Sequence, residues 1–380
     1  MHVHLCLYEI RGIFTMIHEE HLYIAGPMCF YPRGNSMWQS YRKEAEFYGA
    51  IVELPNDNWD SVPGDSIEEK IINNCDISMR KCTAILANIE NHRGFMPDAG
   101  TVFEMGMAYG LGLKCYAYTR DKRAQGAKYF GGSYELDRIL DKDGEILANM
   151  DLPFSDCLVG SSKIIEGDFT DCLRVFREDI EEESKMKAVR GRVETFEEPQ
   201  SFPSKSGKKV VYVGDCHRGP QAEKRHNEMK RILEKYGYEA YTPSDYNVNV
   251  PVLQQMDDPY ARAYNRFDHY QQHVRDCDIY LGILDDHRGY EVDSDVAFES
   301  GMAYMFRDKK MFGYIESAES MADRTHSTAS ESGSPIDING WSTEENGFPV
   351  NMMWGGTKLF RGMDFEEAVR QMTELLKGEE

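Results

Sequence analysis

The segment His92–Glu104, HRGFMPDAGTVFE, recurs later in the same chain as His287–Glu299, HRGYEVDSDVAFE. The two segments share His, Arg, Gly, Asp, Phe and Glu at the same spacing, and in both the final Glu is followed by x-Gly-Met-Ala-Tyr. Agreement at so many positions with one fixed offset indicates an internal duplication. We therefore predict two copies of one domain in a single chain.

The sequence around each motif predicts strands that alternate with helices. Short apolar runs, several of which end in Gly, are typical of buried parallel strands. Such strands are expected at Leu22–Gly26, Ala84–Asn88 and Cys115–Tyr118 in copy one, and at Val211–Gly214, Ile279–Leu284 and Met311–Tyr314 in copy two. Helical patterns occur at Trp38–Tyr48, Val102–Leu111 and Gln221–Tyr236. This alternation predicts an α/β fold with a parallel sheet covered on both faces.

Shifts in composition place the boundaries of the two copies. We expect copy one at residues 1–180, a linker at 181–208 that is rich in Glu, Lys, Ser and Pro, and copy two at 209–380. A second polar segment, Ser317–Pro335, is rich in Ser, Gly and Asp. Because it offers little apolar surface to bury, we expect a mobile surface loop or lid that is poorly ordered without ligand.

The bulk composition excludes several classes of protein. No apolar run reaches the roughly 18 residues of a membrane span, and the apolar patch in Met1–Glu20 has no small-residue cleavage site, so we expect no signal peptide. The nine cysteines form no CxxC pair, which favours reduced thiols in a cytoplasmic protein. A formal net charge of −22 argues against binding of nucleic acid.

The repeated motif places two acids at the start of a predicted helix. Asp98 has the position of an N-cap, and Glu104 lies in the second turn. A purely structural interpretation is a capping Asp and a solvated Glu. However, Glu104 has apolar neighbours, and Asp293 and Glu299 repeat both acids in copy two. Two carboxylates near the carboxyl end of a parallel strand suit glycosyl transfer, in which one acid attacks an anomeric carbon.

Three segments of copy one together resemble the nucleoside 2-deoxyribosyltransferase family. They are Tyr23-Ile24-Ala25-Gly26-Pro27-x-x-Phe30-x-Pro32, Ala84-Ile85-Leu86-Ala87-Asn88 and Arg93-Gly94-x-x-Pro97-Asp98-x-Gly100-Thr101-x-Phe103-Glu104-x-Gly106. The resemblance covers most of both halves of the chain. It implies flavodoxin-like sheets, transfer of 2-deoxyribose between deoxynucleoside and free nucleobase substrates, and no cofactor.

The resemblance also implies roles for particular residues. Glu104 matches the nucleophile, and Asp98 matches a carboxylate that orients the substrate or transfers a proton. Glu299 and Asp293 take the same positions in copy two. The positions expected to bind substrate are Gly26, Phe30, Asp76, Gly100, Asn351 and Met353.

Family members complete each active site with a segment Leu-Pro-x-Asn-x-Met from a neighbouring subunit. Copy two has Phe348-Pro349-Val350-Asn351-Met352-Met353, whereas copy one has Leu152-Pro153-Phe154-Ser155-Asp156-Cys157. Alternatively, Asn351 is a turn residue before a strand Met352–Trp354. We predict that the copies pair as an intramolecular pseudo-dimer with one complete and one degenerate site; further homo-oligomerisation remains open.

Copy two departs from the family pattern, which leaves other functions open. Gly26-Pro27 is paired with Gly214-Asp215, Gly100-Thr101 is replaced by Asp295-Val296, and the family's third carboxylate has only Asp76 as a candidate. The loop Gly214–Gly219 faintly resembles the phosphate-facing loop of deoxynucleotide N-hydrolases. The alternatives are therefore a deoxynucleoside 5′-monophosphate N-glycoside hydrolase and a catalytically inactive nucleotide-binding module.

No metal site is expected from the sequence. His92 and His287 have no ligand partners at the usual spacing along the chain, and His217 is interpreted as isolated.

Overall fold

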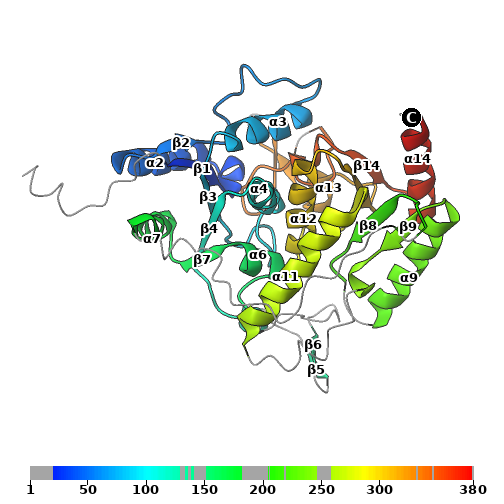
Figure 1. Cartoon of the computed structure of the whole chain (residues 1–380). Helices are drawn as coiled ribbons and strands as arrows, with labels where there is room; N and C mark the ends of the chain where they lie inside the picture. Colours follow the sequence, from blue (N-terminus) through cyan, green and yellow to red (C-terminus); the bar gives the residue numbers. More distant parts are fainter. Residues whose placement is uncertain are drawn as a thin grey trace, which may run out of the picture.

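The computed structural model describes residues 20–128, 133–135, 138–140, 151–181, 204, 206–217, 220–245, 258–330, 333–344 and 346–378. It contains two five-stranded sheets with helices packed on them, one sheet per copy (Figure 1). All strand pairs within these two sheets are parallel. The predicted α/β fold is therefore confirmed. Most of the predicted linker lies outside the described residues.

Copy one has the strand order β2-β1-β3-β4-β7. Its elements are β1 (His21–Ala25), η1 (Pro27–Phe30), α2 (Gly34–Phe47), β2 (Ile51–Glu53), α3 (Ile67–Met79), β3 (Ala84–Asn88), α4 (Ala99–Gly110), β4 (Lys114–Thr119), α5 (Gln125–Lys128), β5 (Ser133–Glu135), β6 (Arg138–Leu140), α6 (Asp156–Ser161), β7 (Lys163–Glu166) and α7 (Phe169–Glu181).

Copy two repeats this order as β9-β8-β10-β11-β14. Its elements are β8 (Val210–Gly214), α9 (Pro220–Lys235), β9 (Glu239–Tyr241), α11 (Pro259–Asp276), β10 (Ile279–Ile283), α12 (Ser294–Met305), β11 (Lys310–Ile315), α13 (Met321–Arg324), β12 (Thr328–Ala329), β13 (Pro335–Ile336), η4 (Met352–Trp354), β14 (Lys358–Arg361) and α14 (Phe365–Gly378). This shared order, 2-1-3-4-5, is that of flavodoxin-like sheets.

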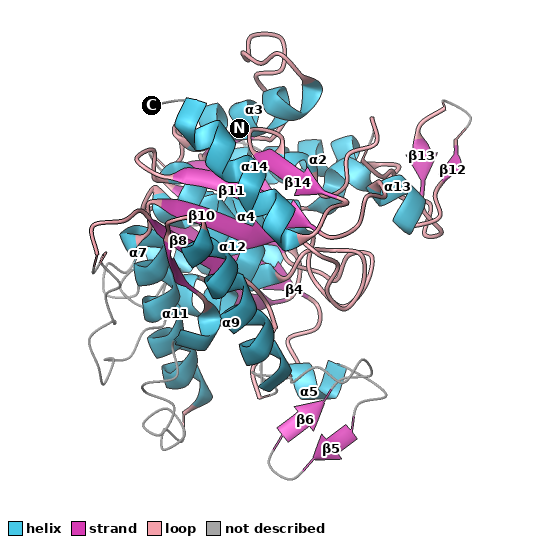
Figure 2. Ribbon diagram, turned by 90° about the vertical axis from the view of Figure 1, so that its right-hand side faces the viewer, coloured by secondary structure: helices cyan, strands magenta, loops and turns pink. Residues whose placement is uncertain are grey.

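Two predicted elements differ in the structure. Met352–Trp354 forms the short 3-10 helix η4 rather than a strand, because the Asn351 side chain caps its first turn. The predicted lid, Ser317–Pro335, contains α13 and a β12–β13 hairpin, visible at the edge of the molecule in Figure 2. Met321 anchors α13 in the body with 1% exposure, so the segment is more than a surface loop; its mobility without ligand stays a prediction.

The strands bury both faces, and alternate side chains enter different cores. On β1, Leu22 and Ile24 face a core between the sheet of copy one and its outer helices, whereas Tyr23 and Ala25 face a central core. The central core contains residues of both copies, among them Phe103 from α4. The two copies therefore share one hydrophobic interior and pack as an intramolecular pseudo-dimer.

The contact between the copies has approximate two-fold symmetry. Gly94 and Gly289 form an antiparallel bridge between the two repeated motifs. The N–H of Phe95 donates to the carbonyl of Arg288 at 3.0 Å, and the N–H of Tyr290 donates to the carbonyl of Arg93 at 3.1 Å. These bonds join equivalent positions of the repeat reciprocally, as in an isologous dimer interface.

Helices α4 and α12 cross at glycines that allow their backbones to approach closely. A Cβ added at Gly106 would lie 2.0 Å from the carbonyl oxygen of Phe298, and one added at Gly301 would lie 2.0 Å from that of Phe103. Backbone atoms cannot move aside as a flexible side chain can. Each helix therefore requires glycine at this crossing.

Gly106→Ala should destabilise the protein by about 2–3 kcal/mol, because the new methyl group overpacks the interface. Urea denaturation would measure the loss in the free energy of unfolding. Gly378→Ala is the matched control, since a Cβ at Gly378 meets nothing within 4 Å. A Gly106→Ala protein as stable as the control would contradict the close crossing of α4 and α12.

Among the described residues, no helix combines the length and apolar character needed to cross a membrane.

Candidate active site

A cavity of about 600 Å³ lies where the carboxyl end of β1 and the start of α4 meet copy two. Open parallel sheets bind ligands at this edge. Copy one contributes the segment after β1, the start of α2 and the first half of α4, and copy two contributes residues 342–344 and 351–353. The predicted site residues that line the cavity are Gly26, Phe30, Asp98, Gly100, Glu104, Asn351 and Met353.

Glu104 projects from the second turn of α4 toward β1. Its side chain is 5% exposed, and its Oε1 accepts a hydrogen bond of 2.5 Å from the hydroxyl of Tyr23. Burial raises the pKa of Glu104 to about 8; the hydrogen bonds from Tyr23 and Cys75 oppose this rise, and the nearby charge of Asp98 adds to it. A buried carboxyl that titrates near neutral pH inside a cavity is a candidate catalytic group.

Asp98 is the N-cap of α4, as predicted, and both copies hold it in place. Its Oδ2 accepts hydrogen bonds from the N–H and the hydroxyl of Thr101 at 2.9 and 2.6 Å. Its Oδ1 accepts one of 2.9 Å from the side-chain amide of Asn351 in copy two. The amide oxygen of Asn351 in turn accepts the N–H of Met353 at 3.0 Å. The amide is thus fixed at both ends.

Gly100 provides the space in which Asn351 reaches Asp98. A Cβ added at Gly100 would lie 2.5 Å from both the Nδ2 and the Oδ1 of Asn351. The other predicted wall residues, Gly26 and Phe30, border the same cavity from the segment that follows β1.

The structure does not bring Asp76 into this cavity. Its carboxylate pairs instead with Arg80, at 2.8 Å, and with Arg307 of copy two, at 2.5 Å. The neighbouring residue Cys75 lines the cavity and forms a hydrogen bond with Glu104. Adjacent helical residues point about 100° apart, so only one of the two can face the site. Asp76 is therefore not placed with the other predicted site residues, and Cys75 takes its place in the lining.

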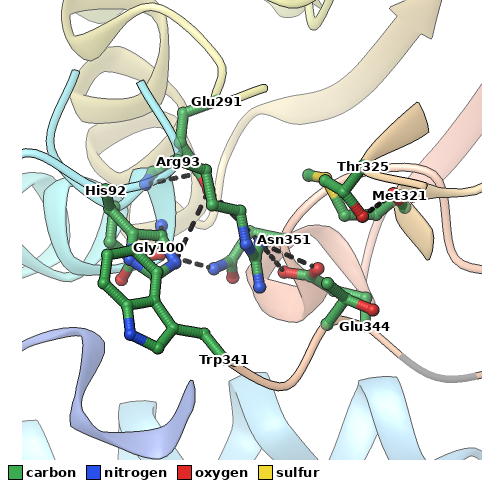
Figure 3. A network of polar contacts seen from close by, with 12 residues as sticks. His92, Arg93, Gly100, Glu291, Met321, Thr325, Trp341, Glu344 and Asn351 are labelled. Carbon is green, nitrogen blue, oxygen red and sulfur yellow. Dashed lines mark hydrogen bonds and ion pairs between the residues drawn. The ribbon is translucent and has the colours of Figure 1, made fainter. Parts of the chain in front are cut away.

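A buried ion-pair network beside the cavity was not predicted from the sequence. Arg93 has a left-handed backbone, with φ of 48°, and its Nη1 lies 3.1 Å from Oε2 of Glu344 and 3.3 Å from Oε1 of Glu291 (Figure 3). Burial raises the pKa of Glu291 well above its usual range, against the opposing charge of Arg93. Its Oε2 also accepts the N–H of Ala99 at 3.1 Å, so a carboxylate of copy two caps α4 of copy one.

One signal in the repeat could have revealed this network. Glu291 stands where copy one has Met96, a charged residue in place of an apolar one inside an otherwise similar motif. Such an exchange marks a position at which the two copies have different partners.

Residues 342–344 of copy two complete the wall of the site, and Trp341 packs beside them on copy one. The ring of Trp341 stacks on His92 with centroids 4.9 Å apart and an interplanar angle of 7° (Figure 3). The N–H of Ser342 donates to the carbonyl of Phe30 at 2.9 Å. These contacts attach copy two directly to the pocket-lining segment of copy one.

The equivalent acids of copy two have different surroundings. Glu299 accepts hydrogen bonds from the hydroxyls of Tyr212 and Tyr280 at 3.0 and 3.1 Å. Asp295, at the position of Gly100, accepts the N–H of Cys157 at 2.9 Å. Cys157 is the counterpart of Met353, so the Asp295 carboxylate replaces the amide oxygen of Asn351.

The segment after β8 also differs from its counterpart after β1. Tyr212 bonds to Glu299 as Tyr23 bonds to Glu104, and this register aligns Asp215 rather than Gly214 with Gly26. The pairing of Gly26 with Gly214 is therefore wrong by one residue. Asp215 is buried, with its Oδ1 2.5 Å from Nδ1 of His217 and its Oδ2 3.2 Å from Nε2 of His226.

Two groups of side chains in the described part of the chain could hold a metal ion by residue type and proximity. One is His92, Asp98 and Glu291, whose carboxylates already cap α4 or pair with Arg93. The other is Asp215, Cys216 and His217. The interpretation of His217 as isolated is wrong, because the turn after β8 folds its ring onto Asp215.

Comparison with known proteins agrees with this architecture. The sequence pattern described as nucleoside 2-deoxyribosyltransferase matches residues 22–155 and again residues 212–353. The chain belongs to the nucleoside 2-deoxyribosyltransferase family. Each match covers four of the five strands of one sheet, which is consistent with the tandem duplication. Family membership indicates a nucleoside deoxyribosyltransferase-like function.

Two solved structures are similar to parts of this family member. A 2-desoxiribosyltransferase from Leishmania mexicana is 27% identical, with 43% of this chain and 98% of that chain covered and a TM-score of 0.34. A 2-deoxyribosyltransferase from the psychrotolerant bacterium Bacillus psychrosaccharolyticus is 15% identical, with 42% and 90% covered and a TM-score of 0.29. The comparison with curated proteins gave no match.

Proposed function

We propose that the protein transfers 2-deoxyribose from a deoxynucleoside to a free nucleobase at one composite site, by a retaining mechanism with Glu104 as nucleophile. The observation that carries the proposal is the bond from Asn351 of copy two to Asp98 of copy one, in the cavity that Glu104 lines. Neither copy alone has this set of groups. The nine cysteines without paired spacing support a cytoplasmic location.

In the first half-reaction, a carboxylate oxygen of Glu104 bonds to C1′ while the C1′–N bond breaks. The electron pair of that bond stays on the departing base, which takes up a proton. The hydroxyl of Tyr23 orients the carboxylate through Oε1. Asp98, held by Asn351 and Thr101, can accept hydrogen bonds from sugar hydroxyls. No cofactor enters this scheme.

In the second half-reaction, a nitrogen of the incoming base attacks C1′ from the face that the first base left and gives up its N–H proton, which balances the proton that the departing base took up. The bond to Glu104 breaks, and the carboxylate is regenerated. Two inversions at C1′ return the original configuration. Copy two then serves mainly as the partner that supplies Asn351 and the wall around Glu344, while its own acids, Glu299 and Asp293, lie in an altered site.

The decisive experiment supplies deoxyinosine with free adenine and follows deoxyadenosine by chromatography. Formation of deoxyadenosine as the β-anomer, dependent on both substrates, is the expected result. Release of hypoxanthine and free deoxyribose with no new nucleoside would show that the enzyme is a hydrolase and would contradict the proposed transfer.

The rival activity, hydrolysis of deoxynucleoside 5′-monophosphates, differs in its substrate. In the sequence, this activity was suggested by the resemblance of the loop after β8 to a phosphate-facing loop. Arg218 of that loop lies outside the described residues. Assaying deoxynucleoside and its 5′-monophosphate side by side separates the two activities. A preference for the monophosphate with water as acceptor would favour the hydrolase, and no reaction with either would favour an inactive binding module.

The pH dependence should report the ionisation of Glu104. Because burial raises its pKa to about 8, only the carboxylate fraction of the free enzyme can attack. We expect kcat/KM to rise with pH and to be about tenfold lower at pH 7 than on the plateau above the pKa. Initial rates between pH 5.5 and 9.5 would test this. A flat profile across that range would contradict the assignment of Glu104 as a nucleophile with a raised pKa.

A further inference from the structure

The second site of the duplicated chain carries an unassigned cluster of metal-binding side chains. After β8, copy two has Asp215, Cys216 and His217 in the positions where copy one has Gly26-Pro27-Met28. One ligand atom from each of the three lies within 4.8 Å of the others. The pocket segment of copy one has thus been replaced by a carboxylate, a thiol and an imidazole.

The repeated motif adds a second imidazole. Sγ of Cys216 lies 3.4 Å from Nδ1 of His287 and 3.6 Å from Nδ1 of His217. In a tetrahedral zinc site, Zn–S bonds of about 2.3 Å and Zn–N bonds of about 2.05 Å place sulfur and nitrogen about 3.6 Å apart. Both observed separations match such an edge. His287 does not belong to the mutually close group of Asp215, Cys216 and His217, so its ring must shift toward that group when an ion binds. In copy one, the equivalent residues Pro27 and Met28 provide no thiol or imidazole near His92.

We propose that copy two binds one zinc-class transition-metal ion through Asp215, Cys216 and His217, with His287 as the fourth ligand. Cysteine and histidine together favour such metals over calcium or magnesium. Oδ1 of Asp215 now lies 2.5 Å from Nδ1 of His217, in a hydrogen bond. A metal between them requires about 3.3 Å, so the carboxylate must retreat by less than an ångström.

Neighbouring side chains hold the proposed metal ligands in place. Nε2 of His287 lies 3.6 Å from Oδ2 of Asp293, which leaves Nδ1 directed at Cys216. Metal-binding histidines usually contact a carboxylate through the second ring nitrogen. His226, which contacts Asp215 at 3.2 Å, is itself held by the hydroxyl of Ser244 at 2.6 Å.

An ion can reach the cluster through an adjoining cavity of about 480 Å³, whose wall includes His217. The wall also carries the acids Asp285, Asp286 and Glu316, together with Arg225 and Arg324. Arg324 faces Asp286, and Arg225 faces Asp285. Arg225 also lies 3.6 Å from Oδ2 of Asp215 and 3.4 Å from Nδ1 of His217, so its guanidinium must turn toward Asp285 when an ion binds.

The test is a titration of the full-length, chelator-stripped protein with Co²⁺, followed by displacement with Zn²⁺. We expect one equivalent of cobalt to bind, with the visible d–d bands of a tetrahedral site and a near-ultraviolet thiolate band. Cys216→Ser should abolish the thiolate band and weaken binding at least tenfold. Asp293→Asn, which changes the group behind His287 and keeps a side-chain oxygen that can cap α12, should weaken binding 10- to 100-fold and keep the thiolate band.

Cys29→Ser is the matched control, since Cys29 is an exposed thiol elsewhere in the chain, and its cobalt binding should equal that of the parent. Circular dichroism verifies that each variant is folded, and zinc should raise the melting temperature of the parent more than that of Cys216→Ser.

Absence of stoichiometric cobalt binding to the parent, or equal binding by Cys216→Ser, would overturn the proposal. Rapid alkylation of Cys216 at neutral pH without any cobalt spectrum would overturn it too, in favour of a thiolate–imidazolium pair with His287. None of these readouts depends on sugar transfer.

Discussion

Glu104→Gln should reduce deoxyribosyl transfer by about 10³-fold or more, because an amide cannot form the covalent bond to C1′. The change keeps the shape of the side chain and its acceptor oxygen for Tyr23. Initial rates with deoxyinosine and adenine would measure the loss. The matched control is Glu299→Gln, which makes the same change at the equivalent position of copy two and should retain most of the activity.

Stability measurements separate a catalytic loss from misfolding. The folded-state pKa of Glu104, about 8, lies above that of an unfolded glutamate, so its stabilising contribution is present at low pH and is lost as pH rises through 8. Gln does not ionise. The Glu104→Gln protein should therefore melt no lower than the parent, and relatively higher at pH 9 than at pH 6. An inactive Glu299→Gln with an active Glu104→Gln would assign catalysis to the other copy.

Gly100→Asp should lower kcat/KM by about 10²-fold, because the new side chain displaces the amide that orients Asp98. A Cβ alone would lie 2.5 Å from the amide atoms of Asn351. Copy two shows that the fold accepts an aspartate here, since Asp295 accepts the N–H of Cys157 where a serine, Ser155, replaces the asparagine.

The control for Gly100→Asp is the reverse exchange, Asp295→Gly, which alters only the second site and should leave transfer at the first unchanged. Combining Gly100→Asp with Asn351→Ser reproduces the arrangement of copy two within copy one. This double variant should regain stability without regaining activity. Full activity of Gly100→Asp would mean that Asn351 does not orient a reactive group.

Much of the fold followed from local patterns. The repeat, the apolar strands and the N-cap at Asp98 depend on neighbouring residues, so the sequence alone predicted them. The meeting of Asp98 with Asn351 was also expected, because the family resemblance named a segment lent by a neighbour. That prediction needed no knowledge of how the copies pack.

Other features depend on tertiary placement that no local pattern encodes. The rotation of α3 about its axis determines whether Cys75 or Asp76 faces the cavity. A shift of one residue along the helix would exchange the two, and the sequence does not fix that rotation. The partnership of Arg93 with Glu344 joins positions 251 residues apart. The contact of His217 with Asp215 depends on the conformation of the turn after β8. The usual ligand spacings along the chain do not predict such a contact.

Because residues of both copies form the active site, it can assemble only late in the synthesis of the chain. Glu104 leaves the ribosome long before Asn351, and at 5–20 residues per second the interval is roughly 10–50 s. During that time the glycine face of α4 and the apolar residues around Phe103 lack their partners on α12. A nascent chain that has completed only its first copy is thus catalytically incompetent and exposes an apolar surface that is prone to aggregate. We therefore expect chaperone binding to the nascent chain to be highest in this interval and to fall once α12 emerges.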